Sequence, residues 1–381
     1  MTGAVKELKF AVISDIHLGH RNTPTEHIVK NLNKYLTNSK VLEEVDMLVM
    51  AGDVFDDLVT LGSDCSPWIM RWITHTLILC AKHDVVLRVL YGTPSHDRGQ
   101  SKHFVSQAEK IKDMIGHDLD LQYVDALSIE WIERFGINVL YVPDELHHDN
   151  ADTLVDVKDL MAAKGLEQVD FAFMHGIFAY QAPMIAKETI KHNEKEYLQL
   201  VKGVIFSGHD HSHSRFDRIY SQGSFDRLVH GEEEKKGFLK AYYRSPEDYE
   251  VKFIENKGAK RYVTVVSYGD DLEEELNRID RQVCNLPDGS FVRIETKKSL
   301  PIAQAVGMLK SRWSNLTWSP PLFKEDKEKD TVKDVLDAPP EYTSIIINPT
   351  TIAKLCSDQL KAAGVDSQTY GLAMEKLMEI R

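Results

Sequence analysis

The chain has 381 residues, of which 43% are hydrophobic and 28% are charged, a composition typical of a globular protein with more than one domain. Its formal net charge of −13 excludes a protein that coats nucleic acid through overall positive charge, but allows a nuclease that holds phosphate with bound divalent cations. No segment approaches the roughly 20 consecutive apolar residues of a membrane span, so no membrane partner is expected.

Strands and helices are predicted to alternate over the first 100 residues. Short apolar runs predict three strands, at residues 9–14, 46–51 and 85–91. Thr23 and Glu26 fit a capping box, and Pro24 suits the first position of the helix that follows. Ser66 and Pro67 indicate the start of a second helix. This alternation is typical of an α/β fold, in which functional groups gather at the carboxyl ends of strands.

The middle of the chain is predicted to be richer in strands, which indicates a mixed sheet and a β-sandwich core flanked by helices. A helix is expected at residues 153–164. The strands are expected at residues 121–124, 128–132, 137–142, 170–174, 204–207, 219–220, 237–244 and 249–254.

The last third of the chain divides into three predicted parts. Two strands and two helices form a small α/β unit, at residues 262–266, 271–284, 291–295 and 301–313. Four Pro residues and an excess of acidic over basic residues then indicate a linker, and two amphipathic helices form a helical C-terminal tail. The expected divisions are residues 1–259, 260–318, 319–344 and 345–381.

Five polar fragments directly follow predicted strands. They are Asp15-x-His17, Gly52-Asp53, Ser95-His96-Asp97, His175-Gly176 and Gly208-His209-Asp210-His211. Residues two apart in an extended or turning segment project the same way, so His209 and His211 can direct two imidazoles into one small volume. A single such fragment is more often an ordinary solvated turn, but five at strand ends favour a shared site.

The candidate metal ligands of these fragments combine carboxylates and imidazoles without a thiolate. They are Asp15, His17, Asp53, Ser95, His175, His209 and His211. This donor set suits a pair of manganese, iron or zinc ions better than a closed structural zinc site. A carboxylate such as Asp53 can bridge two ions about 3.5 to 4 Å apart, which favours hydrolysis of a phosphate ester.

The five ordered fragments resemble the motifs of calcineurin-like metallophosphoesterases. Four segments resemble in particular the SbcD branch, which comprises nuclease subunits of DNA double-strand-break repair and their phage relatives. These segments lie at residues 15–19, 52–56, 223–228 and 231–238, and the resemblance covers roughly residues 8–260. It implies a metallophosphoesterase nuclease domain at residues 1–259 and a DNA-facing capping domain at residues 260–318.

The resemblance also implies a role for each site residue. Asp15, His17, Asp53 and His211 would hold one ion, whereas Asp53, Ser95, His175 and His209 would hold the other. His96 would act on the phosphate, and Asp56, Asp97 and Arg227 would support the ligands or touch substrate, although a structural ion pair also suits Arg227. The family usually has Asn where Ser95 stands, and a hydroxyl is a poorer ligand than an amide oxygen. Looser binding of the second ion is therefore expected.

By this resemblance the cofactor is a pair of divalent ions, with manganese expected. The partners are double-stranded DNA ends and an SbcC-like coiled-coil ATPase, which the tail would grip, with a homodimer inside the complex. Four scattered cysteines and the lack of a signal-peptide pattern favour the cytoplasm of a bacterium or of a phage-infected host. Two alternatives stay open: a phosphoesterase that acts on phosphoproteins or cyclic nucleotides, and a non-catalytic scaffold that keeps the fold.

Overall fold

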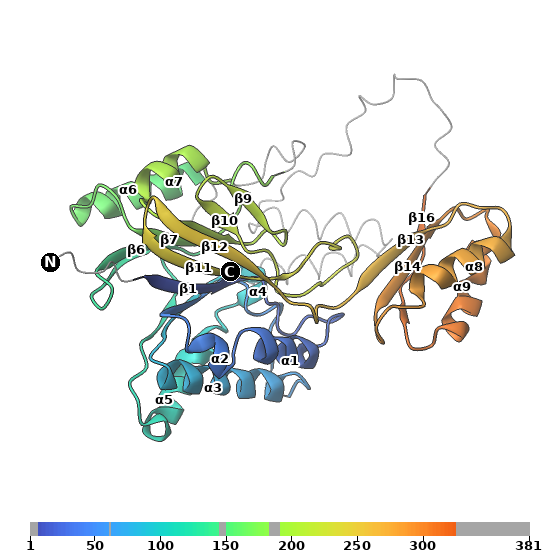
Figure 1. Cartoon of the computed structure of the whole chain (residues 1–381), viewed down its shortest axis with the longest axis horizontal. Helices are drawn as coiled ribbons and strands as arrows, with labels where there is room; N and C mark the ends of the chain where they lie inside the picture. The colour runs from blue at the N-terminus through green and yellow to red at the C-terminus, as the bar shows by residue number, and fades with distance from the viewer. Residues whose placement is uncertain (1–6, 61, 145–149, 183–190, 325–381) are drawn as a thin grey trace, which may run out of the picture. The chain divides into compact units, whose positions relative to one another are not determined.

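The computed structural model describes residues 7–60, 62–144, 150–182 and 191–324, which belong to one compact unit spanning Met1–Lys324 (Figure 1). The predicted tail at residues 345–381 and most of the predicted linker at residues 319–344 lie outside the described residues. Among the helices in the described ranges, none combines the length and the apolar character that crossing a membrane requires.

The first sheet has the strand order β12-β11-β1-β2-β3-β4. Its parallel part consists of β1 (Leu8–Ile13), β2 (Met47–Ala51), β3 (Val86–Leu90) and β4 (Leu121–Val124). The hairpin of β11 (Gly237–Ser245) and β12 (Asp248–Glu255) adds to β1 in the antiparallel sense. Every residue of β2 and β3 is buried, as expected for parallel strands that are covered on both faces. Because β1, β2 and β3 are parallel, their carboxyl ends lie along one edge.

The second sheet is mixed, as predicted, with the strand order β5-β6-β7-β8-β10-β9. Its strands are β5 (Ser128–Ile132), β6 (Ile137–Val142), β7 (Phe171–His175), β8 (Ile205–Gly208), β9 (Ser214–Phe216) and β10 (Ile219–Ser221). The central strands β6, β7, β8 and β10 run parallel, whereas β5 and β9 pair antiparallel at the two edges. The central strands therefore also end together.

Aromatic side chains between the two sheets form the centre of the sandwich. Phe10 on β1 packs against Phe171 and Phe173 on β7, with ring centroids 4.7 and 5.9 Å apart. Phe173 in turn stacks on Phe206 of β8 at 5.4 Å. These buried rings come from alternate positions of their strands, which is the period that places side chains on one face of a sheet.

Helices cover the outer face of each sheet (Figure 1). The helices α1 (Thr25–Tyr35), α2 (Ser39–Leu42), α3 (Ser66–Lys82) and α5 (Lys102–Ile115) share a core with β1, β2 and β3. The helices α6 (Asn150–Ala163) and α7 (Glu194–Leu200) pack on the second sheet. The predicted fold class is thereby confirmed: an α/β fold with two sheets flanked by helices.

The predicted start of the first helix is wrong in detail. Pro24 is the N-cap and α1 begins at Thr25, with no side-chain hydrogen bond that caps the helix. The hydroxyl of Thr23 is buried instead, where it donates to the carbonyl of Arg227 over 2.8 Å and lies 3.0 Å from the hydroxyl of Tyr262. The tertiary contact has replaced the local cap that the sequence pattern indicates.

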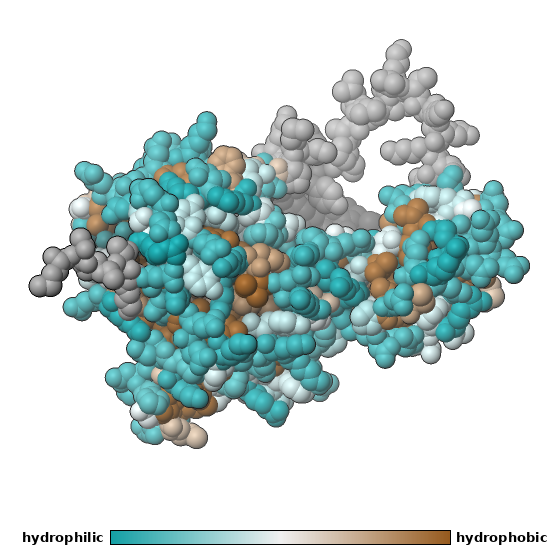
Figure 2. Space-filling view, viewed as in Figure 1, coloured by the Kyte–Doolittle hydropathy of each residue, from teal (hydrophilic) through white to brown (hydrophobic). Residues whose placement is uncertain are grey.

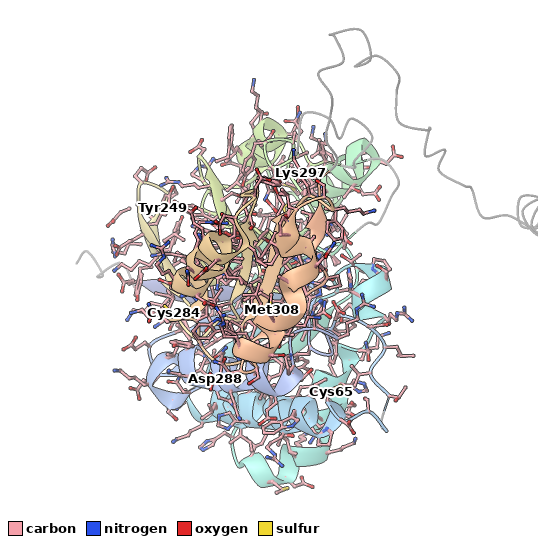
Figure 3. All side chains as sticks on the ribbon, turned by 90° about the vertical axis from the view of Figure 1, so that its right-hand side faces the viewer. Cys65, Tyr249, Cys284, Asp288, Lys297 and Met308 are labelled. Atoms are coloured by element: carbon pink, nitrogen blue, oxygen red, sulfur yellow. The ribbon has the colours of Figure 1, made fainter. Side chains whose placement is uncertain are left out.

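The small α/β unit lies where its four elements were predicted. It contains β13 (Tyr262–Val266), α8 (Leu272–Val283), β14 (Phe291–Thr296) and α9 (Pro301–Arg312), followed by β15 (Thr317–Trp318) and β16 (Leu322–Phe323). The strands pair in parallel, and the two helices bury their own apolar core against them. Met308 on α9 is 50% exposed on the side turned to the viewer in Figure 3. Regular structure continues into residues predicted as linker, because β16 pairs with β14.

The molecular face in Figure 2 is mostly hydrophilic, and its hydrophobic residues are scattered in small areas. Scattered surface apolar residues are normal in globular proteins.

Candidate metal centre

The strand ends of both sheets bring the predicted metal ligands together. Asp15 and Asp53 each stand two residues after a strand of the first sheet, β1 and β2. From the second sheet, His175 ends β7 and His209 follows β8. The backbone N–H of His209 donates to Oδ2 of Asp15 over 3.0 Å, which joins the two groups of loops. The site is thus built from both halves of the sandwich.

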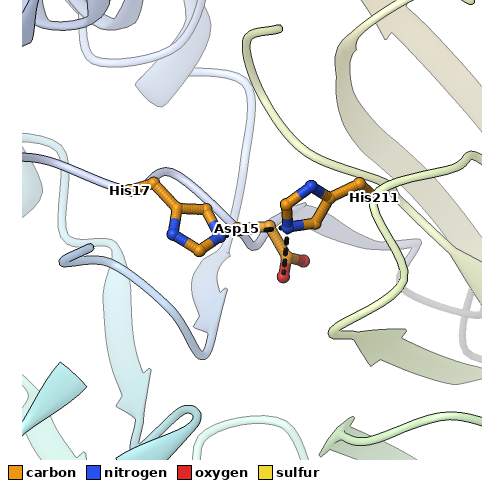
Figure 4. A group of neighbouring side chains, drawn as sticks. All are labelled: Asp15, His17 and His211. Carbon is orange, nitrogen blue, oxygen red and sulfur yellow. Dashed lines mark hydrogen bonds and ion pairs between the residues drawn. The ribbon is translucent and has the colours of Figure 1, made fainter. Parts of the chain in front are cut away.

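Asp15, His17 and His211 form the first cluster, in which one ligand atom from each residue lies within 4.8 Å of the others (Figure 4). The Nε2 atoms of His17 and His211 are 3.1 Å apart, and Nε2 of His211 is 4.0 Å from Oδ1 of Asp15. Asp15 and His17 are buried, whereas His211 is partly exposed. One side of the cluster therefore opens to solvent.

In both His17 and His211, the ring nitrogen Nδ1, which is not the one that faces the cluster, lies next to a carboxylate. Nδ1 of His17 lies 3.0 Å from Oδ1 of Asp56, and Nδ1 of His211 lies 2.6 Å from Oε1 of Glu232. A ring whose Nδ1–H donates to a carboxylate presents an unprotonated Nε2, so two lone pairs would face each other at 3.1 Å. Only a proton or a metal cation between the rings relieves that repulsion. Burial lowers the pKa of His211, but Glu232 and Asp15 outweigh this effect and raise it.

Asp53, His175 and His209 form the second cluster. Nε2 of His175 lies 3.3 Å from Oδ2 of Asp53, while its Nδ1 donates to the carbonyl of Ala51 over 2.7 Å. A Cβ atom at Gly52 would lie 2.1 Å from Nδ1 of His175, so only glycine allows this approach. The backbone bond fixes the ring so that Nε2 points at the carboxylate.

The electrostatics of this cluster favour a bound cation. Burial lowers the pKa of His175, but the carboxylates of Asp53, Asp15 and Asp144 outweigh burial and raise it to about 10. Burial raises the pKa of Asp53, and the opposing effect of His175 leaves it well below the usual range. In the metal-free cluster, these effects favour the charged forms of both His175 and Asp53. A divalent cation would take the place of the imidazolium proton.

Thr93, rather than Ser95, supplies the hydroxyl next to the second cluster. Oγ1 of Thr93 lies 3.0 Å from Oδ2 of Asp53. The same atom is 3.4 Å from Nε2 of His175 and 3.3 Å from Nδ1 of His209. Oγ1 of Thr93 thus lies within 3.4 Å of one ligand atom from each member of the second cluster, so it would be a further oxygen donor to an ion held there.

Ser95 is exposed in the short helix α4 (Pro94–Asp97), and its carbonyl accepts a hydrogen bond from Arg98. The metal-ligand role expected for Ser95 gains no support from this position. Thr93 follows β3 by three residues, and this position just after a strand is the signal in the sequence that could have identified it.

His96 lies at the rim of the first cluster, in a group with His17 and Asp56. Its Nδ1 donates to the carbonyl of Asp56 over 2.8 Å, and its ring lies edge-on to that of His17 with centroids 5.0 Å apart. The side chain is 40% exposed. Nε2 of His96 is therefore available to a substrate, which is compatible with the predicted action on a phosphate.

Asp97 stabilises the loop that contains Thr93 and His96 by accepting two hydrogen bonds. Its Oδ2 accepts from the backbone N–H of Gly92 at 3.0 Å, and its Oδ1 accepts from the hydroxyl of Ser101 at 2.8 Å. Burial is the main cause that raises the pKa of Asp97 to about 6. Its role in the structure is to hold the loop.

Arg227 is buried and donates to the backbone carbonyls of Lys260, Glu233 and Glu234. The bonds to Glu233 and Glu234 hold the segment 231–237, in which Glu232 contacts His211. Sequence reasoning misses Glu232, because no pattern in the chain places it next to the distant His211.

Four candidate ligands have a left-handed backbone. The φ angles are 51° at Asp15, 54° at His17, 49° at Asp53 and 93° at His209. Residues other than glycine rarely adopt these values, and such strain concentrates at functional sites. The sharp turns redirect each side chain from its strand end into the shared site.

The donor set as a whole fits a pair of divalent cations. Each cluster combines carboxylate oxygen with imidazole nitrogen, and the outer nitrogens of His17, His175 and His211 are held by oxygen acceptors. Such outer contacts are typical of metal-binding histidines. The clusters show that a metal could bind here, and the choice of manganese stays a prediction.

Comparison with known proteins adds little about function. No family model matches the chain, and no curated protein matches it. The solved structure of TT1561 of Thermus thermophilus is similar over 65% of this chain and 99% of its own, with 10% sequence identity and a TM-score of 0.35. A second solved structure covers 66% of this chain and 100% of its own, with 14% identity and a TM-score of 0.38. At these values the likeness supports no functional conclusion.

Proposed function

We propose that the chain is a two-metal phosphodiesterase that cleaves DNA at its ends, as the nuclease subunit of an SbcD-type complex. The position of Asp53 is the observation that carries this proposal. Its Oδ2 lies 3.3 Å from Nε2 of His175 and 4.0 Å from Nε2 of His17. One carboxylate oxygen thus faces both clusters, as a ligand shared between two ions would.

Different residues of the chain would have different roles in phosphodiester hydrolysis. A pair of divalent ions would polarise the phosphate and lower the pKa of a bound water. Asp56 and Glu232 orient His17 and His211, so that both Nε2 atoms face the site. In its protonated form, His96 at the rim would donate from Nε2 to a phosphate oxygen while its Nδ1–H stays bonded to the carbonyl of Asp56.

DNA is proposed as the substrate because the segments 223–228 and 231–238 resemble the SbcD branch. The second of these segments contains Glu232, which contacts His211 within the first cluster. The resembling segment is thus part of the site itself, which favours a nuclease over other phosphoesterases.

The test is manganese-dependent degradation of linear and circular DNA by the purified chain, with and without an SbcC-like ATPase. Small phosphate esters serve as the comparison, and Asp53→Asn as the inactive control. Cleavage of linear DNA that stops in excess chelator is expected. Activity on small esters without activity on DNA would instead favour the phosphoprotein or cyclic-nucleotide alternative.

The partner proposal concerns residues 345–381, which lie outside the described residues. A chain that ends near Lys329 should keep its metal-dependent hydrolysis and lose association with the ATPase. Unchanged co-purification of the shortened chain with that partner would contradict a role for the tail.

A further inference from the structure

Tyr180 and Phe216 form a partly exposed aromatic pair beside the second sheet. Their rings stack with centroids 5.4 Å apart and an interplanar angle of 25°. Tyr180 also stacks on Phe178, a buried member of the core under this sheet, with centroids 6.4 Å apart. Phe216 is 40% exposed, and among the described residues Tyr180 alone places an aromatic ring against it. Phe216 therefore ends a row of three rings that begins in the core and reaches solvent.

Hydrogen bonds join this aromatic pair to a turn that carries metal ligands. The hydroxyl of Tyr180 lies 3.1 Å from Oγ of Ser214, the first residue of β9. Nε2 of Gln181 donates to Oγ of Ser214 and to Oδ2 of Asp210, each over 3.4 Å. Asp210 stands between the two histidine ligands of that turn. The pair is thus held next to the metal centre by direct contacts.

The position of Phe216 along β9 gives its distance from the edge where the ligands gather. Ser214 pairs with Ser221, the last residue of β10, and β10 runs parallel to β8. Ser214 therefore lies at the ligand edge, and Phe216 lies two residues further on, roughly 7 Å away. Two base steps of a duplex strand cover a similar distance, at about 3.4 Å each. A DNA strand that runs from the metal centre along this edge would bring one of its first few bases to Phe216.

The chemistry of the exposed ring favours a nucleobase as its ligand. The flat face of an aromatic side chain stacks on any base, provided that the base is not stacked inside a duplex. The neighbouring Arg215 is exposed as well, and its side chain is a cation. Aromatic rings combined with basic side chains are typical of surfaces that hold single-stranded nucleic acid.

We propose that Phe216, supported by Tyr180, stacks on an unpaired base of the DNA strand whose phosphate lies at the metal centre. The pair positions the substrate without contacting the ions or the reacting atoms. Single-stranded or frayed ends should therefore bind better than fully paired ends. This inference rests on the proposed function and deepens it, because it names an unpaired base as the group that the enzyme recognises.

The experiment compares two labelled short strands that bind to the full chain, measured by fluorescence anisotropy with Mn²⁺ present. One strand carries thymine at every position, and the other has the same sugar–phosphate backbone without bases. Phosphorothioate linkages slow cleavage of both, and gel electrophoresis verifies that they stay intact. The wild type should bind the thymine strand roughly 5- to 150-fold more tightly, the range expected for one base stacked on an aromatic ring.

Phe216→Leu should lose most of this preference and bind the base-free strand like the wild type. Phe216→Tyr should keep the preference, because the ring remains. With a cleavable single strand, Phe216→Leu should raise KM and leave kcat unchanged, as expected when an interaction equal in the ground state and the transition state is removed. The thermal midpoints of both variants should match that of the wild type, because Phe216 is partly exposed.

Trp131→Leu is the matched control. Trp131 is also an exposed aromatic residue, at 57%, and it lies on β5, at the opposite edge of the same sheet from β9. This variant should keep the full preference for the thymine strand.

Three results would overturn the inference. The first is that the wild type binds the two strands equally, the second is that Phe216→Leu keeps the full preference, and the third is that Trp131→Leu loses it to the same extent. DNA cleavage is measured separately. A preference for bases without cleavage of any DNA would remove the proposed nuclease activity and leave the base site standing, whereas cleavage with equal binding of both strands would remove only the base site.

Discussion

Replacing Glu232 with Gln should weaken metal binding at the first cluster without unfolding the protein. Oε1 of Glu232 accepts from Nδ1 of His211 at 2.6 Å, and Oε2 accepts from the backbone N–H of Leu228 at 2.8 Å. Glutamine keeps the shape but has one acceptor oxygen and no charge. A hydrogen bond to a charged group contributes about 1.5–3 kcal/mol, which corresponds to roughly 10- to 100-fold in affinity.

Calorimetric titration of Mn²⁺ into wild-type and Glu232→Gln protein measures this loss. Glu234→Gln is the matched control, because Glu234 also pairs with the buried Lys236 but makes no contact with His211 that would orient it. Only the Glu232 variant should bind the first ion more weakly. Equal affinities for all three proteins would refute the reasoning, as would an equal loss in the Glu234 variant.

The same residue gives a prediction for the dependence of stability on pH in the metal-free protein. Burial raises the pKa of Glu232, but His211 and Lys236 outweigh burial and lower it to about 2. Since the folded pKa lies below the value of about 4.3 in an unfolded chain, Glu232 stabilises the fold above that pH. The contribution, on the order of 3 kcal/mol, is lost as the pH falls towards 2. The difference in free energy of unfolding between wild type and Glu232→Gln should therefore shrink below about pH 4.3 in urea titrations.

Three further changes separate the roles within the site. Asp53→Asn should abolish hydrolysis, and metal analysis should find fewer than two bound ions per chain. The circular dichroism spectrum should stay that of the wild type, and full activity of this variant would exclude a bridging role for Asp53. Thr93→Ala should raise the manganese concentration needed for half-maximal activity, whereas Ser95→Ala should leave it unchanged. If only Ser95→Ala raised that concentration, Ser95 rather than Thr93 would be the ligand. His96→Ala should keep both ions but lose roughly 10²- to 10⁴-fold in single-turnover rate, and loss of the ions would contradict its position at the rim.

The strand-end positions of the site can be predicted because the pattern is local. A buried parallel strand is a short apolar run, and a polar residue directly after it must lie at the carboxyl edge of the sheet. From the sequence alone, this argument places Asp15, Asp53, His175 and His209 in one region. The structure brings all four together with His17 and His211.

Local pattern cannot identify the groups that depend on turn geometry or on distant contacts. Thr93 and Ser95 are two residues apart, and only the turn into α4 decides which hydroxyl reaches Asp53. Glu232 contacts His211 from a loop that Arg227 holds through the backbone carbonyls of Glu233 and Glu234, an arrangement with no signature in the sequence.

The left-handed backbone at Asp15, His17, Asp53 and His209 affects how the site can change in evolution. Each such residue destabilises the fold by on the order of 1 kcal/mol or more relative to an unstrained one, whereas glycine adopts the same φ angle readily. Selection on folding alone would favour glycine at all four positions, so only the need for their side chains retains them. A lineage released from that need would gain stability as it lost these ligands, and decay of the site should begin at these four turns.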